Sequence, residues 1–339
     1  MEIGTDNDPS PITGAIEIDS TMIVIKEGGV YEVQLADQID PDRINIDVPN
    51  AQQQILAHGS GTEFVRQTLV TAEALFRSNC VADHVDKNEV LSASLAAAKD
   101  LAAMADLLDQ IATEVGQGTA AKVEGKTANL PALKELEPRV KTFIQKADHV
   151  LQSLMRIIRA FFGQDAGRKW FESLHELTAH RFGTDDGFAL FLGEALPYLK
   201  SVRAARNCVE HPREGQKLVL KNFSLQTVPL AIVPPTIKVV HPNHAMPEAP
   251  LVTFLQGLQG FVSCVFEETL AGLCNKNLRE FGAIKFGVVE TPAEKRTEFD
   301  SKYRVTIIEG PPLPNTAATG SVGDAASEGS DPSKPASND

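Results

Sequence analysis

The sequence predicts an α+β protein in which helices dominate, with a helical bundle between N-terminal strands and a C-terminal extension of strands and one helix. Three observations support this class. β-Branched runs fill the first fifty residues, helical apolar spacing follows from about residue 61 to 211, and strand patterns return after that. The 339 residues allow two or three domains, or one core with appendages.

Residues 1–50 are predicted to form short strands. β-Branched side chains are concentrated in three runs, AIEI, TMIVI and VYEVQL, and the turn signal EGG separates the second from the third. The polar stretch DPDRINIDVPN, which contains two prolines, is expected to be a loop.

Residues 51–215 are predicted to form the helical bundle. Apolar residues recur at helical spacing in five consecutive segments: TEFVRQTLVTAEALFRS, NEVLSASLAAAKDLAAMADLLDQIATEV, PALKELEPRVKTFIQKADHVLQSLMRIIRAFFG, RKWFESLHELTAHRFG and GFALFLGEALPYLKSVRAARNCVEH. The glycines of GQGTAAKVEGKTANLP are expected to end the second helix, and Pro197 to kink or delay the fifth. Five helices with short connections indicate a bundle.

Residues 216–308 are predicted to form an extension in which strands surround one helix. The strand patterns are QKLVLKNFSLQ, PPTIKVVHP, AIKFGVVE and YRVTIIE, and the helix lies in APLVTFLQGLQGFVSCVFEETLAGLCNKNLREFG. Residues 309–339 contain almost no large apolar side chains, so a disordered tail is expected there.

Charge and cysteine content restrict the function classes only loosely. The net charge of −13 arises at the ends, because residues 1–50 carry −9 and residues 309–339 carry −4. The middle of the chain is close to neutral, which removes most of the electrostatic objection to a nucleic-acid partner. No apolar run reaches the length of a membrane span, and the acidic N-terminus lacks a signal pattern. The lack of such a run predicts no membrane partner. Four scattered cysteines favour a reduced, cytoplasmic protein.

The segment SVRAARNCVEHPREGQK gathers ionisable groups at the end of the fifth helix. At about 100° per residue, five polar side chains share one arc of about 140°: Arg203, Arg206, Asn207, Glu210 and His211. Small apolar residues lie on the opposite side, as in any amphipathic helix. The arc alone therefore favours a solvated helix face. The types of side chain in the arc, two arginines, an asparagine, a glutamate and a histidine, are what indicate a catalytic or binding site.

These groups match the parts of a metal-free phosphodiester cleavage site. His211 precedes Pro212, so the helix should end there, and the helix dipole and Glu210 favour the protonated ring. Asn207 is placed to hydrogen-bond that ring and fix its orientation. Arg203 and Arg206 offer forked donors that suit a phosphate. The histidine would move protons, an arginine would stabilise charge on phosphorus, and no cofactor is expected.

The run from Arg206 to His211 resembles the motif of the HEPN superfamily, an arginine and a polar residue followed by three residues and a histidine. HEPN domains are helical bundles with this motif on a late helix. The resemblance implies a metal-independent endoribonuclease, a homodimer whose two motifs face each other, often in a toxin or phage-defence setting. It makes Arg206 and His211 the catalytic pair, Asn207 and Glu210 supporting residues, and Arg203 a phosphate-binding residue.

Other interpretations of the same features stay open. Non-catalytic HEPN members imply an interaction or dimerisation module, with a protein partner at the strand regions. In the plainest alternative the arginines and Glu210 form surface ion pairs and His211 caps the helix. The pair His241 and His244 is expected to be a solvated loop, and Trp170 is expected to belong to the bundle core. The basic residues of the third helix favour a solvated face over a nucleic-acid groove: Arg139, Lys141, Lys146, Arg156 and Arg159.

Overall fold

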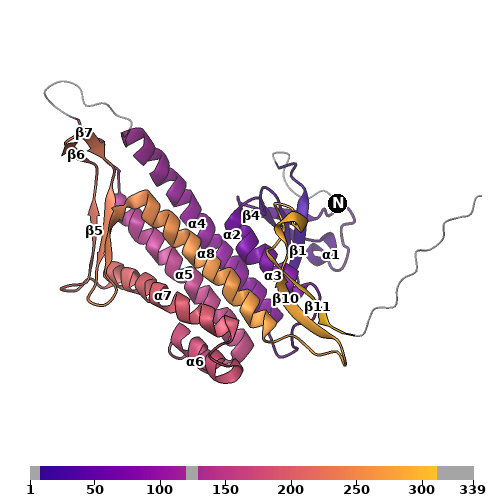
Figure 1. The fold of residues 1–339 in the computed structure, drawn as a ribbon. Helices are drawn as coiled ribbons and strands as arrows, with labels where there is room; N and C mark the ends of the chain where they lie inside the picture. Colours follow the sequence, from indigo (N-terminus) through magenta and orange to yellow (C-terminus); the bar gives the residue numbers. More distant parts are fainter. Residues whose placement is uncertain (1–7, 120–128, 311–339) are drawn as a thin grey trace, which may run out of the picture.

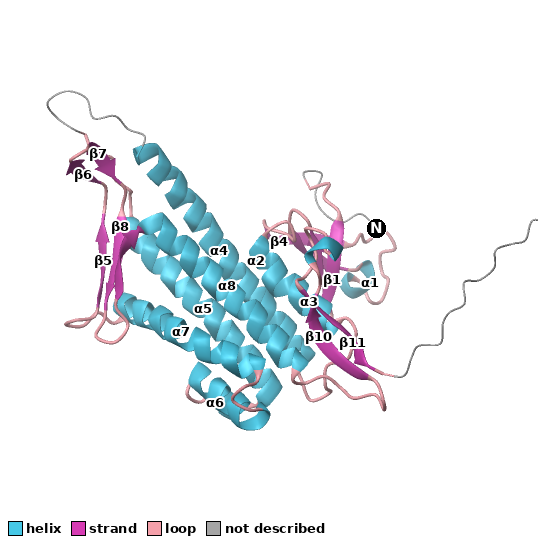
Figure 2. Ribbon diagram, viewed as in Figure 1, coloured by secondary structure: helices cyan, strands magenta, loops and turns pink. Residues whose placement is uncertain are grey.

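The computed structural model describes residues 8–119 and 129–310, with 49% helix and 23% strand. Long helices occupy the centre, and strands lie at both ends of them (Figures 1 and 2). This confirms the predicted mixed class with helices dominant. Nearly all of the expected disordered tail, 309–339, falls outside the described residues.

The N-terminal strands form one antiparallel sheet in chain order. It consists of β1 (Ile12–Ile18), β2 (Thr21–Lys26), β3 (Val30–Gln34) and β4 (Ala51–Leu56), with the short helix α1 (Ala36–Ile39) before the last strand. The first three strands are those the sequence predicts. β4 lies in the range assigned to the bundle, and its sequence AQQQIL is weak in β propensity. Pairing with β3, where Gln53 lies opposite Glu32, determines its conformation.

The bundle contains four long helices: α4 (Lys87–Thr119), α5 (Leu136–Phe162), α7 (Gly187–Glu210) and α8 (Leu251–Asn275). α6 (Phe171–Phe182) packs on α7 after the short turn η2 (Gln164–Gly167). A helical run before α4 is made of α2 (Glu63–Val65), the π-helical turn η1 (Arg66–Val70) and α3 (Thr71–Phe76). α8 contacts α4, α5 and α7, so a helix from the predicted extension completes the bundle.

Helical periodicity in α5 explains why this helix is central. Its apolar stripe is buried along the whole length, including Val140, Phe143, Ile144, Ala147, Val150, Leu151, Leu154 and Ile158. Burying each large side chain of this kind contributes about 1.5–3 kcal/mol. The stripe packs against α4 on one side and against α7 and α8 on others. The buried apolar residues form one continuous cluster that runs from the N-terminal sheet through the bundle to β8.

Two glycines of the run GQGTAAKVEGKTANLP lie inside the last described turn of α4. α4 continues through Gly116 and Gly118 to Thr119. A Cβ atom added at Gly118 would lie 2.3 Å from the ring of Phe223, so only glycine permits this close approach. The sequence places the end of this helix within GQGTAAKVEGKTANLP, and α4 enters that run as far as Thr119, beyond which residues 120–128 are not described.

The helix α7, which carries the polar arc at its C-terminal end, is capped at its N-terminus and continues without a break through Pro197. Asp186 caps the helix, because its carboxylate accepts hydrogen bonds from Phe188 N (3.1 Å) and Ala189 N (3.4 Å). Burial alone would raise the pKa of Asp186, but its ion pair with Lys276 holds that pKa below the ordinary value. Pro197 lies inside the continuous helix rather than delaying its start.

The remaining strands lie at the two ends of the bundle. A three-stranded sheet beyond the end of α7 consists of β5 (Lys217–Lys221), β8 (Thr236–Val240) and β9 (Met246–Pro250). Between β5 and β8 in the chain, β6 (Ser224–Thr227) and β7 (Leu230–Val233) form a separate two-stranded hairpin. β10 (Lys285–Glu290) and β11 (Tyr303–Glu309) pair beside α3, separated by the turn η3 (Ala293–Lys295). None of the helices in the described residues is long and apolar enough to cross a membrane.

Candidate functional site

The predicted polar arc lies on the last turns of α7, partly open to solvent. Arg203 and His211 are exposed, and Arg206, Asn207 and Glu210 are half-buried. The opposite side of the helix is buried in the bundle, through Val202, Ala204, Ala205, Cys208 and Val209. The segregation predicted from the sequence is therefore confirmed, and the polar side is available to a ligand.

Arg206 is held by two acidic side chains. Its Nε lies 3.7 Å from Asp148 Oδ2 on α5, and its Nη2 forms an ion pair with Glu210 one turn later on α7. Its Nη1 donates to Asn207 Oδ1 at 3.4 Å. Nε is buried and has no hydrogen-bond partner among the described residues. The guanidinium is thus fixed in orientation while part of its donor capacity is unused.

His211 ends α7, as the following proline predicts. Its backbone has φ −135°, and its N–H donates to Asn207 O at 2.9 Å. The imidazole is exposed and makes no hydrogen bond or ion pair with the described residues. The expected hydrogen bond from Asn207 to this ring is not formed, because the Asn207 amide oxygen faces Arg206 instead. Glu210 likewise pairs with Arg206, so neither residue orients the imidazole.

Arg203 lies over the indole ring of Trp170. The guanidinium carbon is 5.1 Å from the ring centroid, within the range of a cation–π interaction. Trp170 itself packs edge-on against Phe171, with 4.8 Å between ring centroids. The assignment of Trp170 to the core is confirmed only in part, since the indole packs against the core but is half-buried, whereas Phe171 is fully buried. Trp170 directly precedes α6, and part of its side chain is exposed beside Arg203.

A hollow of about 280 Å³ adjoins this stacked pair, between α7, the start of α6 and the β8–β9 loop. We call it the α7 hollow; its lining residues are Trp170, Glu172, Lys200, Arg203, Ala204, Asn207, His241 and His244. Two residues of the predicted site therefore share a depression with residues far away in the sequence. The β8–β9 loop is held near α7 in part by Cys208 Sγ, which donates to Val240 O at 3.5 Å.

His241 and His244 form a stacked pair at the edge of the α7 hollow. Their ring centroids are 5.6 Å apart with an interplanar angle of 30°. Backbone N–H groups of Asn243 and His244 lie 3.3 and 3.2 Å from His241 Nδ1, which therefore accepts. In the neutral ring this arrangement places the proton on Nε2. Sequence reasoning treated this pair as solvated; only the strand pairing of β8 and β9 brings it to α7.

Two alternative sites find no support in the geometry. Burial raises the pKa of the Cys208 thiol, which opposes formation of a nucleophilic thiolate. Four basic residues of α5 are paired with acids rather than aligned along an open groove: Arg139 with Glu114, Lys141 with Glu137, Lys146 with Asp100 and Arg156 with Glu89. Within the described ranges, no group of three or more His, Cys, Asp or Glu side chains is arranged to hold a metal ion.

Comparison with known proteins matched the chain to no protein family, no curated protein and no solved structure. The chemistry of the site must therefore be argued from its own residues. The end of α7 presents a fixed guanidinium, a free imidazole, a cation stacked on an aromatic ring and a histidine-lined hollow. All of these groups are suited to bind or cleave a phosphodiester without a metal.

Proposed function

We propose that this protein is a metal-independent endoribonuclease of the HEPN type that acts as a homodimer. The observation that carries the proposal is the α7 hollow, in which Arg203 and Asn207 of the predicted site meet Trp170, His241 and His244. Cations beside an aromatic face and imidazoles are the groups that bind single-stranded RNA, through its phosphates and bases. The free cysteines favour a cytoplasmic location, and a toxin or phage-defence role fits such an activity.

RNA binding is assigned to the hollow. Arg203 and Lys200 would contact phosphate oxygens, and a base would stack on the part of the Trp170 ring that lines the hollow. The imidazoles of His241 and His244 add hydrogen-bond donors at the other edge. Because the cation on Trp170 is already ordered by stacking, less side-chain freedom is lost when RNA binds.

Cleavage is assigned to His211 and Arg206. An imidazole removes the proton of a ribose 2′-hydroxyl, the 2′-oxygen attacks phosphorus, and the bond from phosphorus to the 5′-oxygen breaks. The 5′-oxygen takes up a proton, which leaves a 2′,3′-cyclic phosphate and a 5′-hydroxyl. Arg206 stabilises the additional negative charge on the phosphoryl oxygens. His211 lies at the C-terminal end of α7, whereas the Arg206 guanidinium is held by Asp148 of α5. Because the two side chains of one chain are held apart in this way, Arg206 of one chain and His211 of the other would together complete one site.

The test is cleavage of single-stranded RNA in the presence of EDTA. We expect cleavage by the full chain and a loss of about a hundredfold or more in rate for His211→Ala and for Arg206→Ala. His180→Ala is a matched control, because His180 is exposed on α6 and lies outside the hollow. His241→Ala should raise KM more than it lowers kcat, since His241 is assigned to binding.

Three results would contradict this proposal: no cleavage of any RNA by folded protein, cleavage that EDTA abolishes, or equal activity in His211→Ala and His180→Ala. The oligomeric state adds a second criterion. Light scattering should give the mass of a dimer, and mixing His211→Ala with Arg206→Ala should restore part of the activity if the two chains form shared sites.

A non-catalytic dimerisation or interaction module is the second candidate, and one observation favours it. Tyr198 of α7 is 64% exposed, and its ring packs 5.7 Å from that of Phe261 on α8. This aromatic pair lies about 140° around α7 from Arg203, away from the polar arc. Exposed apolar residues of the β6–β7 hairpin, Leu225, Val228 and Leu230, offer a further protein-binding surface. A dimer that Tyr198→Ser dissociates, without any RNA cleavage in wild type, would support this candidate.

A further inference from the structure

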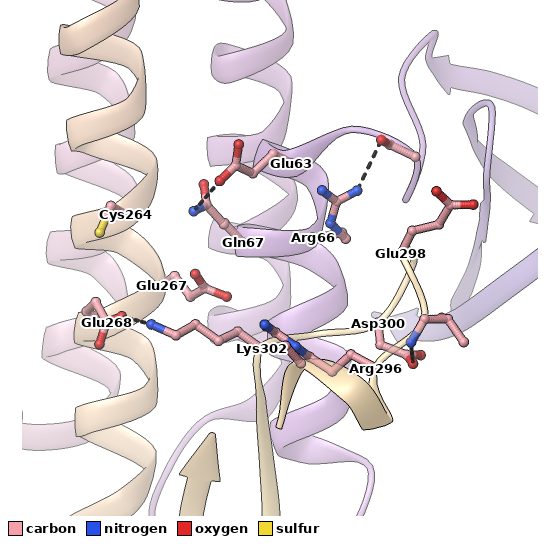
Figure 3. A pocket seen from close by; sticks show the side chains of 13 residues that line it. Glu63, Arg66, Gln67, Cys264, Glu267, Glu268, Arg296, Glu298, Asp300 and Lys302 are labelled. Atoms are coloured by element: carbon pink, nitrogen blue, oxygen red, sulfur yellow. Dashed lines mark hydrogen bonds and ion pairs between the residues drawn. The ribbon is translucent and has the colours of Figure 1, made fainter. Parts of the chain in front are cut away.

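A second cavity lies far from the α7 hollow, where α8 meets the α2–η1 run and the segment between β10 and β11 (Figure 3). We call it the junction cavity. Its volume is about 710 Å³, within the range of small-molecule sites. Its lining is mostly polar and charged: Gly61, Glu63, Arg66, Gln67, Cys264, Glu267, Glu268, Ala293, Arg296, Thr297, Glu298, Asp300 and Lys302.

Glu267 is a buried carboxyl group in this lining that has no cationic partner. It is 4% exposed and forms no ion pair with any described residue. The adjacent Glu268, by contrast, binds Lys302 Nζ at 2.8 Å and the hydroxyl of Tyr303 at 2.7 Å. Burying a carboxylate without a counter-charge costs several kcal/mol unless the group takes up a proton. Burial accordingly raises the pKa of Glu267.

The hydroxyl of Thr71 allows Glu267 to change its protonation state. Thr71 Oγ1 lies 3.1 Å from Glu267 Oε1, 2.8 Å from Arg66 O and 2.9 Å from Ser301 Oγ. A hydroxyl carries one hydrogen, so it donates to only one of these atoms at a time. It donates to Glu267 when the carboxylate is ionised; when the carboxyl is protonated, it accepts from Glu267 and donates to Arg66 O. Both states keep the Glu267–Thr71 hydrogen bond.

Arg296 is a cation in the same lining that has no anionic partner. Its half-buried side chain makes no ion pair or hydrogen bond with the described residues. Arg66, in the same lining, instead donates to Ser60 O and Gly61 O at 2.8 and 3.0 Å. Figure 3 shows Glu267 and Arg296 approaching the cavity from opposite walls. One cavity thus holds an acid and a base that form no ion pair with each other or with any other described side chain.

We propose that the junction cavity binds a zwitterionic small molecule, with a guanidinium or ammonium group at Glu267 and a carboxylate at Arg296. Charge-assisted hydrogen bonds of this kind are the strongest that side chains make, and both guanidinium and carboxylate groups can pair in a bidentate way. An organic cation fits better than a metal ion, because no three ligating side chains converge in the described residues. This site is separate from the ribonuclease proposal and does not depend on it.

The affinity of this site should depend on pH. The other charged groups in the lining around Glu267 are Glu63, Arg66, Glu268, Arg296, Glu298, Asp300 and Lys302. Burial has the largest influence on the pKa of Glu267 and raises it. The hydrogen bonds with Thr71 and Gln67 and the charge of Lys302 lower this pKa, and the charge of Glu268 raises it. A cation needs the ionised carboxylate, so binding releases a proton whenever Glu267 is protonated in the free protein. Affinity therefore rises with pH until the raised pKa of Glu267 is passed.

Calorimetric titration of the full chain with three probes tests the proposal. L-Arginine carries both charged ends, agmatine lacks the carboxylate, and L-norvaline lacks the guanidinium. Arginine should bind most tightly. Glu267→Gln should weaken arginine and agmatine by about tenfold or more, because it removes a charge-assisted bond and keeps the side-chain shape. Arg296→Gln should weaken arginine by a similar factor and leave agmatine unchanged.

Glu298→Gln is the matched control, since Glu298 is an exposed carboxylate in the same lining. It should change arginine binding less than about twofold. Thermal melts establish that each variant is folded. The proposal is wrong if folded wild-type protein binds none of the probes, or if Glu267→Gln and Glu298→Gln have equal effects. Loss of this binding in a protein that still cleaves RNA would separate the two proposals.

Discussion

The polar end of α7 and the junction cavity both gather charged groups on the same bundle, but they differ in how those charges are paired. At the end of α7, Arg206 is compensated by Asp148 and Glu210, and the unpaired His211 is exposed to water. In the junction cavity, Glu267 is buried and has no ion-pair partner among the described residues. The first arrangement is partly open to solvent and its cation is compensated; the second encloses a carboxyl group that has no counter-ion among the described residues.

The stability of the fold can account for the ion pairs of Arg206, but it does not account for a buried carboxyl group without a counter-ion. Ion pairs at an open surface contribute about 0–1 kcal/mol, and they persist whether or not the surface has a function. A buried carboxyl without a cation lowers the free energy of unfolding when it ionises, so folding alone gives no reason for it. Perturbed acids in cavities are for that reason indicators of binding or catalytic sites. The proposal for the α7 site therefore rests on the chemical types of its residues, whereas that for the junction cavity rests on the burial of Glu267 without an ion-pair partner among the described residues.

The largest expected effect is a loss of stability near the α7 hollow that leaves the junction cavity unchanged. Phe171→Ala should lower the free energy of unfolding by about 3–5 kcal/mol, because it empties a fully buried position beneath Trp170. Urea unfolding measures the loss. Trp170 is the single tryptophan of the chain, so its fluorescence reports whether the turn before α6 moves.

Phe162→Ala is the control for this variant, since Phe162 is only half-buried at the end of α5. Its effect should be clearly smaller, and neither change should alter arginine binding at the junction cavity. Equal losses in both variants would mean that Phe171 does not anchor the Trp170 turn.

The sequence predicts most of the fold because helical periodicity and β-branched runs are local signals. The stripe of α5, the first three strands and the end of α7 at His211 all follow from neighbouring residues. β4 and the last turn of α4 do not, because pairing with β3 and contact with Phe223 decide them. Likewise, nothing local indicates that α8 joins the bundle, since its apolar face would suit any partner.

The candidate sites are predictable only in part, for the same reason. The polar arc of α7 follows from helix geometry, but which of its members touch depends on Asp148, a residue from another helix. Trp170, His241 and His244 reach α7 through tertiary packing, so their part in the hollow carries no sequence signal. Glu267 is one of two adjacent acids on the apolar helix α8, and only its burial and the lack of an ion-pair partner among the described residues distinguish it.

The second effect tests how strongly Arg206 depends on its acidic partner Asp148. Asp148→Ala should lower the free energy of unfolding by about 1–3 kcal/mol, because it leaves the partly buried Arg206 with Glu210 alone and also removes the acceptor of Gln152 Nε2. Chemical denaturation measures this loss. The exposed pair of Glu137 and Lys141 on the same helix supplies the control, and Glu137→Ala should change stability by about 0.5 kcal/mol or less. If the two variants are equally stable, Asp148 does not hold Arg206.

The smallest expected effect is a gain in stability, rather than a loss, when Glu267 is replaced, and its size depends on pH. The pKa of Glu267 is raised above its ordinary value of 4.5, so its contribution to stability is fully present below that value and is lost as pH rises through the raised pKa. The Glu267→Gln variant has no proton to lose at this position and keeps a hydrogen bond with Thr71. It should therefore gain stability relative to wild type as pH increases, whereas Asp148→Ala loses stability at neutral pH. Denaturant midpoints between about pH 4 and pH 8 measure the difference, with Glu298→Gln as the exposed control.

Parallel curves for wild type and Glu267→Gln would show that the buried carboxyl carries no energetic cost. A widening gap that saturating arginine closes would show that the ligand supplies the missing positive charge. The reason is that a bound cation stabilises the ionised carboxylate of wild type, whereas the neutral amide of the variant gains nothing comparable.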